Sequence, residues 1–159
     1  MKKLGYFLII AAALLCSSTQ MRMDIGALKP IEAVWIGREN DHYLIETDTG
    51  DYGLGETLLQ AVKHLKDTSG GEIYLDTATF VVTEKEVLED LGELKDILQK
   101  DSYIIIEDGW TNLPNAAQFL RTHQTDATFK DYLDGMRNYP VLSCSDGRYE
   151  IVNANYAEK

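Results

Sequence analysis

The chain has 159 residues, 45% of them hydrophobic, and carries a formal net charge of −11 at neutral pH. This length and composition predict one globular domain with a substantial hydrophobic core. The excess of acidic residues excludes nucleic acid as a partner bound through its phosphates, and it repels the body of the domain from anionic lipid head groups. Any contact with a membrane is therefore expected through the N-terminus.

Residues 1–20 differ from the rest of the chain and predict a signal peptide or a membrane anchor. Lys2 and Lys3 precede an apolar run over residues 4–15, and small polar residues follow it. This is the layout of a secretory signal peptide. The apolar run is shorter than the roughly 20 residues that a transmembrane helix needs. We therefore expect export, with the protein either secreted or associated with the outer face of the cell membrane.

Cys16 is a candidate for lipid modification after signal cleavage, as in bacterial lipoproteins. A small residue precedes the modified cysteine in such signals, whereas Leu15 holds that place here. Three outcomes stay open, namely lipidation at Cys16, an uncleaved anchor, and simple secretion. The second cysteine, Cys144, is predicted to be a buried, inert thiol, with pairing to Cys16 as the alternative.

The first half of the chain predicts a linker, a hairpin and a helix. Residues 21–30 have mixed polarity and end in a Lys-Pro pair, which is typical of a linker. Runs rich in Val, Ile, Trp and Tyr at 32–37 and 42–47 predict two strands joined by a four-residue connection. A polar turn region follows, and the spacing of leucines then predicts a helix over 56–66.

The second half predicts alternating strands and helices. The run 71–83 reads as a largely buried strand, and Thr83 with Glu86 predicts a capping box that starts a helix over 84–100. The continuous apolar run 103–107 predicts a central strand covered on both faces. A helix is predicted after Pro114, and its inward side chains are expected to be Ala116, Phe119, Leu120 and His123. A less regular stretch follows this helix. A hairpin is then predicted around Asp146-Gly147, with strands at 141–145 and 148–152.

These elements predict the order ββαβαβα followed by a C-terminal hairpin. Such alternation is typical of an α/β (α+β) domain, in which helices pack on a mixed sheet. The strands at 71–83 and 103–107 flank a helix and should be parallel. Residues 31–159 are therefore expected to form a single α/β domain.

Two stretches of the sequence invite a ligand-binding interpretation. The glycines of residues 52–57 follow a strand and open a helix, as in a phosphate loop, but the third glycine and the lysine of the known fingerprints are missing. Carboxylates crowd the neighbouring loop, and such clusters can hold Ca²⁺, although the spacing is not that of an EF-hand. The alternatives are a plain turn with a helix cap, and a solvated acidic face. The carboxylates are those of Glu46, Asp48, Asp51 and Glu56.

No reactive constellation is evident among the nucleophilic and basic side chains. His42, His64 and His123 belong to no zinc or protease pattern, so structural roles are favoured. Cys144 lacks the flanking glycines of a nucleophile elbow. Trp35 and Trp110 are candidates for core or for partner anchors, and Asp76 predicts a bulge or polar edge in its strand.

Three segments together resemble a known family. They are Gly-Glu-Thr-Leu-Leu-Gln-Ala-Val-Lys-His-Leu from Gly55, Glu-Ile-Tyr-Leu-Asp-Thr-Ala-Thr-Phe-Val-Val-Thr-Glu from Glu72, and Tyr-Ile-Ile-Ile-Glu-Asp-Gly from Tyr103. This succession, with Tyr139-Pro140-Val141-Leu142 near the end, resembles the N-terminal domain of Ger(x)C-type spore-germination lipoproteins, the C subunits of germinant receptors. The resemblance implies a membrane-associated lipoprotein that contacts other proteins during spore germination.

We therefore expect an extracytoplasmic interaction module that is not an enzyme and has no cofactor. Its expected partners are the membrane, through the N-terminus, and other proteins at that membrane. Two alternatives stay open. One is a small secreted enzyme whose site is assembled from distant residues such as His42, His123, Asp108 and Asp76. The other is a Ca²⁺-binding module that uses the acidic loop.

Overall fold

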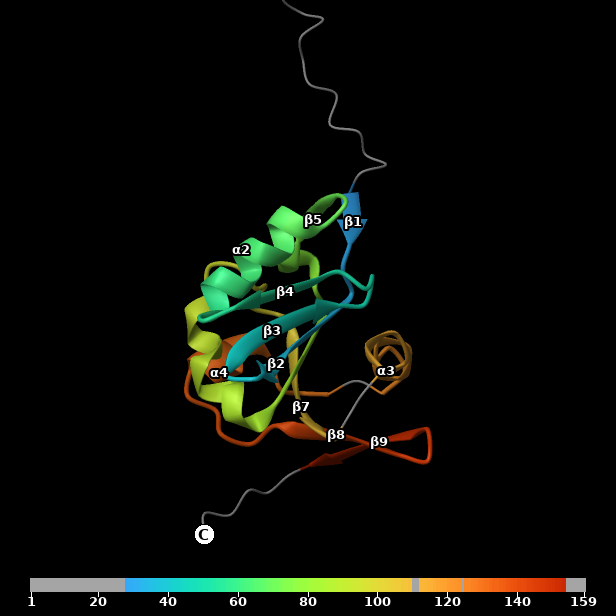
Figure 1. Ribbon diagram of the computed structural model, residues 1–159. Coiled ribbons are helices and arrows are strands. Elements are labelled where there is room, and N and C mark those ends of the chain that lie inside the picture. The colour runs from blue at the N-terminus through green and yellow to red at the C-terminus, as the bar shows by residue number, and fades with distance from the viewer. Residues whose placement is uncertain (1–27, 110–111, 124, 154–159) are drawn as a thin grey trace, which may run out of the picture.

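A seven-stranded mixed sheet forms the centre of the domain (Figure 1). The computed structural model describes residues 28–109, 112–123 and 125–153. The four middle strands β2, β6, β7 and β8 are parallel to one another, and antiparallel strands extend the sheet on both sides. In spatial order the strands are β4 (Tyr52–Gly55), β3 (His42–Thr47), β2 (Ala33–Glu39), β6 (Phe80–Thr83), β7 (Tyr103–Asp108), β8 (Pro140–Ser145) and β9 (Arg148–Asn153).

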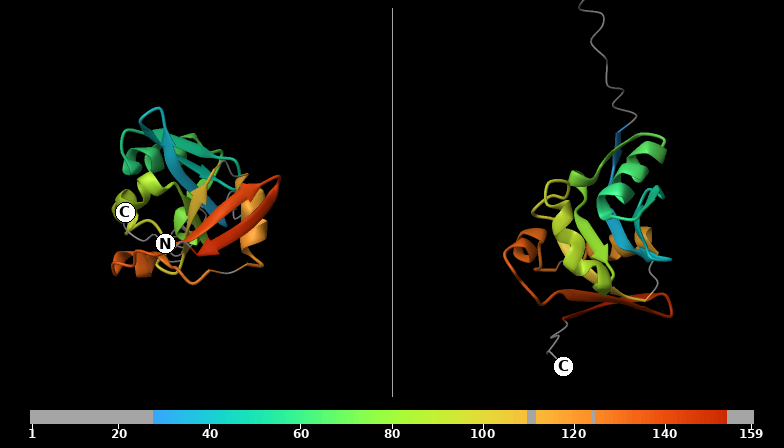
Figure 2. Two further views of the ribbon diagram at one scale, coloured as in Figure 1. Left: turned by 90° about the horizontal axis from the view of Figure 1, so that it is seen from below. Right: turned by 60° about the vertical axis from the view of Figure 1, so that its left-hand side comes forward.

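Helices cover the two faces of this sheet unequally (Figure 2). On one face α2 (Leu58–Thr68), the 3₁₀ helix η3 (Lys85–Leu94) and the short α4 (Phe129–Leu133) enclose the larger hydrophobic core. On the other face α3 (Leu113–Leu120) encloses a smaller core with β2, β6, β7 and β8. This arrangement confirms the predicted α/β class with helices packed on a mixed sheet.

Strand β7 confirms the prediction of a central strand. Ile104, Ile105 and Ile106 are all buried, with Ile104 and Ile106 in the larger core and Ile105 in the smaller one. Successive side chains of a strand point to opposite faces, so a continuous apolar run is expected where both faces are covered. The parallel pairing of β6 with β7 was also predicted correctly.

The run 71–83, expected to be one strand, is interrupted. It consists of β5 (Glu72–Tyr74), the 3₁₀ turn η2 (Leu75–Thr77) and β6. The Thr77 hydroxyl donates to the Tyr74 carbonyl at 2.8 Å, and the Ala78 N–H to the Leu75 carbonyl at 3.2 Å, which turns the backbone away from a strand. The expected linker also ends earlier than predicted, because its last residues form β1 (Leu28–Pro30), parallel to β5.

The helix predicted over 84–100 is shorter and lacks its capping box. Thr83 donates its hydroxyl hydrogen to the Ile36 carbonyl at 3.0 Å, in the neighbouring strand, and therefore does not cap η3. A capping box starts α4 instead, in the stretch expected to be irregular. There the Thr128 hydroxyl accepts from the Asp131 N–H, and the Asp131 carboxylate accepts from the Thr128 N–H.

Both hairpins form where the sequence predicted them. The C-terminal hairpin turns at Asp146-Gly147, with φ of +53° and +74°. The first hairpin is tighter than expected, because its turn is the two residues Asn40 and Asp41, with φ of +49° and +65°. Positive φ at both positions is the geometry of the two-residue turns that match strand twist.

The two longer α-helices lie close to their predicted ranges. The side chain of Thr57 accepts from the Gln60 N–H to begin α2, and that of Asn112 accepts from the Asn115 N–H to begin α3. Ala116 and Leu120 are buried as predicted, whereas His123 is exposed and Phe119 is only partly buried. Within the described residues, no helix is long and apolar enough to cross a membrane.

Strand β4 was missed because its glycines suggested a turn. Gly53 and Gly55 face α2 at very short range, and a Cβ atom on Gly53 would lie 2.2 Å from the Ala61 carbonyl oxygen. A Cβ on Gly55 would lie 2.4 Å from the Ala61 nitrogen. Only glycine permits this approach of helix to strand, so the glycine pattern of residues 52–57 serves packing.

We predict that Gly53→Ala destabilises the domain by about 3 kcal/mol, because the new methyl group meets helix backbone, which cannot rotate away. Urea denaturation monitored by circular dichroism measures this change. Gly92→Ala is the matched control, since its Cβ would lie 3.6 Å from the Tyr132 hydroxyl, an ordinary contact. Equal midpoints for the two variants would contradict the packing role of Gly53.

Candidate functional site

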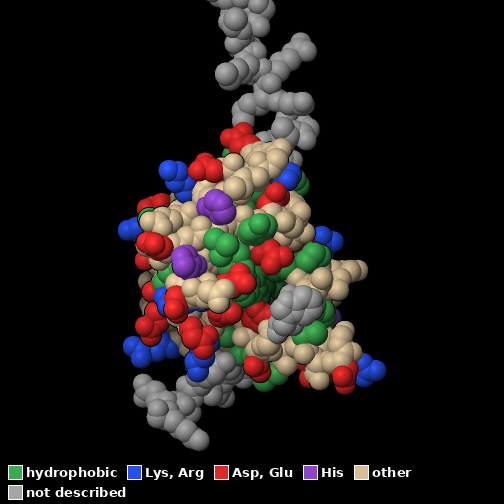
Figure 3. Space-filling model, in the orientation of Figure 1, with side chains coloured by type: hydrophobic (Ala, Val, Ile, Leu, Met, Phe, Trp, Pro, Cys, Tyr) green, Lys and Arg blue, Asp and Glu red, His purple; other side chains and the backbone are tan. Residues whose placement is uncertain are grey.

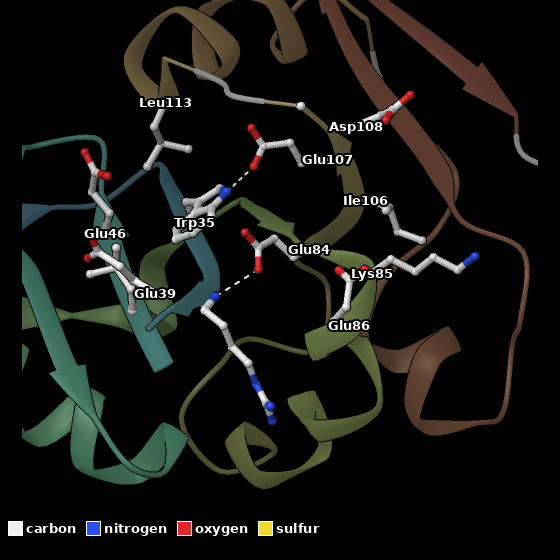
Figure 4. A pocket seen from close by; sticks show the side chains of 13 residues that line it. Trp35, Glu39, Glu46, Glu84, Lys85, Glu86, Ile106, Glu107, Asp108 and Leu113 are labelled. Atoms are coloured by element: carbon white, nitrogen blue, oxygen red, sulfur yellow. Dashed lines mark hydrogen bonds between the residues drawn. The ribbon is translucent and has the colours of Figure 1, made fainter. Parts of the chain in front are cut away.

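The candidate site is a cleft of about 750 Å³ at the carboxyl ends of the parallel strands β2, β6 and β7. In open α/β sheets this edge is where ligands usually bind. Figure 4 shows the side chains that surround it. The strand ends, the neighbouring strand β3 and the first residues of η3 and α3 supply its lining, which consists of Trp35, Arg38, Glu39, Leu44, Glu46, Glu84, Lys85, Glu86, Ile106, Glu107, Asp108, Gly109 and Leu113.

The cleft continues onto a part of the sheet that no described helix covers. Gly53 and Gly55 face α2, so Tyr52 and Leu54 project from the opposite face of β4, where they are 57% and 36% exposed. Leu44 lies beside Leu54 in the strand register. On the side of the molecule seen in Figure 3, hydrophobic side chains are exposed between acidic ones. We call Trp35, Leu44, Tyr52 and Leu54 the open face.

Trp35 connects the open face to the cleft. Its side chain is half-buried, and its indole N–H donates to the Glu107 carboxylate, as drawn in Figure 4. The six-membered ring lies over Gly37, because a Cβ atom there would be 2.2 Å from Trp35 Cη2. A hydrogen bond at one end and a glycine beneath the ring thus fix the orientation of the indole.

The cleft is strongly acidic. Its lining contains six carboxylate side chains but only two basic ones, Arg38 and Lys85. The Arg38 guanidinium donates to the Tyr43 hydroxyl and lies 4.5 Å from the Tyr43 ring centre, and it also donates to Asp90 at 3.3 Å. The hydrogen bond with Tyr43 and the charge of Asp90 raise the pKa of Arg38. The Arg38 guanidinium is therefore paired with Tyr43 and Asp90, and the carboxylates that line the cleft outnumber its basic side chains.

The acidic loop considered for Ca²⁺ is held by protein groups instead. Asp51 pairs with Lys29 at 3.0 Å. Burial raises the pKa of Asp51, but hydrogen bonds from Lys29 and Thr49 outweigh burial, so the pKa is lowered overall. Asp48 accepts from the Glu32 N–H at 3.3 Å, and burial raises its pKa. In the part of the chain that the structure describes, no three His, Cys, Asp or Glu side chains lie close enough to hold a metal ion.

The three histidines do not come together. The His42 ring contacts the Asn40 carbonyl oxygen at the tip of the first hairpin, and His123 stacks on Phe119 with ring centres 4.0 Å apart. His64 accepts the Leu54 N–H through Nδ1 at 3.0 Å, on the outer edge of β4. None of them lines the cleft.

The remaining candidates also have separate locations. Asp108 lines the cleft, whereas Asp76 lines a different surface depression, so the constellation of His42, His123, Asp108 and Asp76 is not assembled. Cys144 is a free thiol in β8 and is half-buried, not fully buried as expected. Cys16 and Trp110 lie outside the described residues.

Comparisons of the chain with protein-family models, with curated proteins and with solved structures found no match. The function must therefore be inferred from the chain's own residues and geometry.

Sequence reasoning missed most of the cleft. Of its residues only Trp35, Glu46 and Asp108 were candidates, and they were assigned to different hypothetical sites. A usable signal was present, because Glu84 directly follows the buried Thr83 and Glu107 directly follows the buried Ile106, both near the ends of parallel strands. The strand ends of a parallel sheet share one edge, so these carboxylates are brought together.

We predict that Gly37→Ala displaces the Trp35 ring, because the new methyl group would overlap Cη2 and Cζ2 of the indole. With Trp110→Phe as background, Trp35 is the only one of the two tryptophans left. Its fluorescence emission should then shift to longer wavelength as the ring moves into solvent. Gly92→Ala should leave the emission unchanged, and an unchanged spectrum in Gly37→Ala would show that the ring does not rest on Gly37.

Proposed function

We propose that this chain is a non-enzymatic interaction module that is exported, is held at the outer face of the cell membrane by its N-terminal segment, and binds another protein through the open face and the cleft. The observation that carries the proposal is the uncovered apolar part of the sheet. Exposed, contiguous apolar side chains with a polar rim mark interaction sites in soluble proteins. Here the rim is formed by the carboxylates of the cleft.

The composition of the cleft supports binding more than nucleophilic catalysis. Its described lining contains no histidine, cysteine, serine or threonine. A nucleophile with an adjacent general base is the usual arrangement for covalent catalysis. A half-buried tryptophan beside leucines is instead the composition of binding surfaces, where aromatic residues contribute much of the affinity.

The direction of the strands supports presentation of the cleft away from the N-terminus. Strand β1 follows the N-terminal segment and lies beyond the amino end of β2, whereas the cleft lies at the carboxyl end of β2 (Figure 1). Seven strand residues separate these ends by about 20 Å. A chain anchored through its N-terminus would hold the cleft on the side remote from the lipid. The resemblance to the first domain of a germinant-receptor lipoprotein agrees with such a role.

Photo-cross-linking tests the interaction. A photoreactive phenylalanine analogue at Leu54 should yield a defined adduct with another protein in membranes of the native host, because Leu54 lies on the open face. The control position is Leu59, which is 51% exposed but lies on α2, on the other side of the sheet. Adducts of equal yield from both positions, or none from Leu54, would overturn the proposal.

Intact mass spectrometry tests the attachment. Protein recovered from the membrane fraction should begin at Cys16 and carry a diacylglyceryl increment, and Cys16→Ala should lose both the increment and the membrane association. A soluble protein that begins after Ser18 or Thr19 would contradict membrane attachment. The cross-linking result stands independently of this outcome.

A further inference from the structure

We propose that the cleft binds an extended basic segment of a partner protein and that an arginine side chain of this segment stacks on Trp35. The inference rests on the proposed function, because it names the chemistry of the partner. It is carried by three features of the described residues, namely the charge of the cleft, the aromatic ring at its centre and the closed edge of β4.

The charge of the cleft fits a cationic occupant. Six carboxylates line it, and the exposed Glu46 side chain forms no hydrogen bond or ion pair with a described residue. Arg38 is bound to Tyr43 and Asp90, and the Lys85 ammonium points away from Trp35 in Figure 4. The electrostatic potential inside the cleft is therefore negative, which attracts a cation and repels an anionic segment.

Trp35 makes arginine the preferred cation. Its side chain is partly exposed, and the ring is fixed by Glu107 and Gly37, so it offers a preorganised surface on which a planar guanidinium can stack. Glu46 lies directly across from Trp35 in the strand register, with its carboxylate exposed. A guanidinium stacked on the indole can therefore donate to this carboxylate while its aliphatic stem contacts Leu44 or Leu113, which also line the cleft.

The edge of β4 is not open to strand addition. The outward Leu54 N–H donates to His64 Nδ1 at 3.0 Å, and the Thr68 hydroxyl, which donates to the His64 carbonyl at 2.8 Å, lies 3.4 Å from the outward Tyr52 carbonyl oxygen. A bound segment would need these two backbone groups to pair with the sheet. The occupant therefore binds on the face of the sheet, through its side chains.

Calorimetric titration of the full-length chain in an uncharged detergent tests this inference. The probe is acetyl-Gly-Arg-Val-Arg-Gly-amide, with the corresponding Lys and Glu peptides for comparison. We expect the Arg peptide to bind more tightly than the Lys peptide, the Glu peptide not to bind, and the Arg affinity to fall as NaCl rises from about 50 to about 300 mM. Absence of binding by the Arg peptide would overturn the inference.

Substitutions in the cleft test whether the Arg peptide binds there. Trp35→Leu should weaken binding at least about tenfold, with Trp35→Phe intermediate, once circular dichroism confirms that each is folded. Glu46→Gln with Glu84→Gln should weaken it about tenfold, and the new amide oxygen at position 84 would still accept the Arg38 N–H. The matched control is Glu93→Gln with Asp126→Asn, which removes two exposed charges outside the cleft and should change the affinity less than about twofold. Equal effects of the two pairs would show attraction by net charge alone.

Two further arms distinguish other modes of binding. His64→Ala frees the Leu54 N–H, so tighter peptide binding in this variant would indicate strand addition and contradict binding on the face. If N-acetylarginine amide bound as tightly as the peptide, the cleft would be a site for a small cation. This result would contradict the proposal that the cleft binds an extended segment. Unchanged affinity in His64→Ala and much weaker binding of the small amide are the expected results.

The outcomes separate this inference from the proposed function. Cross-links from Leu54 without binding of the Arg peptide would leave an interaction module whose partner is not basic. Binding of the peptide without cross-links would leave a cation-binding cleft but remove the protein partner at the membrane.

Discussion

The fold depends on the need to bury both faces of its central parallel strands. In β7 three consecutive isoleucines are buried, so this strand requires a layer of helix on each side. The stretches α2, η3 and α4 supply a complete layer on one face, while α3 alone supplies the other. The outer strands β3 and β4 lie beyond the reach of α3, and their second face stays uncovered. The open face is thus a direct result of unequal coverage of one sheet.

The sequence predicted those elements whose signals are local. Alternating or continuous apolar runs identified β2, β3, β7 and the C-terminal hairpin, and Asp146-Gly147 located its turn. The errors arose where a side chain found a distant backbone partner. Thr83 hydrogen-bonds to Ile36 in the next strand, which removed the expected capping box. Gly53 and Gly55 looked like turn residues because the helix that packs against them could not be read from their neighbours.

The candidate site was less predictable than the fold for a related reason. Its carboxylates come from separate segments, with Glu46 on β3, Glu84 after β6 and Glu107 on β7, and only the order of strands brings them together. The residues that attracted attention in the sequence have structural partners instead. Asp51 is paired with Lys29, and His64 holds the edge of β4. Clustering along the chain was therefore a poor guide to clustering in space.

The protected edge of β4 affects how copies of this chain can associate with one another. An edge strand with free backbone groups beside exposed leucines is a template on which identical chains can add strand by strand into fibres. His64 accepts the outward Leu54 N–H and Thr68 lies beside the outward Tyr52 carbonyl, so the β4 edge of one copy is not free to pair with a strand of another. Many copies concentrated on one surface could then display the open face without adding strands at β4. The same two side chains that exclude a partner's strand would keep neighbouring copies from pairing at this edge.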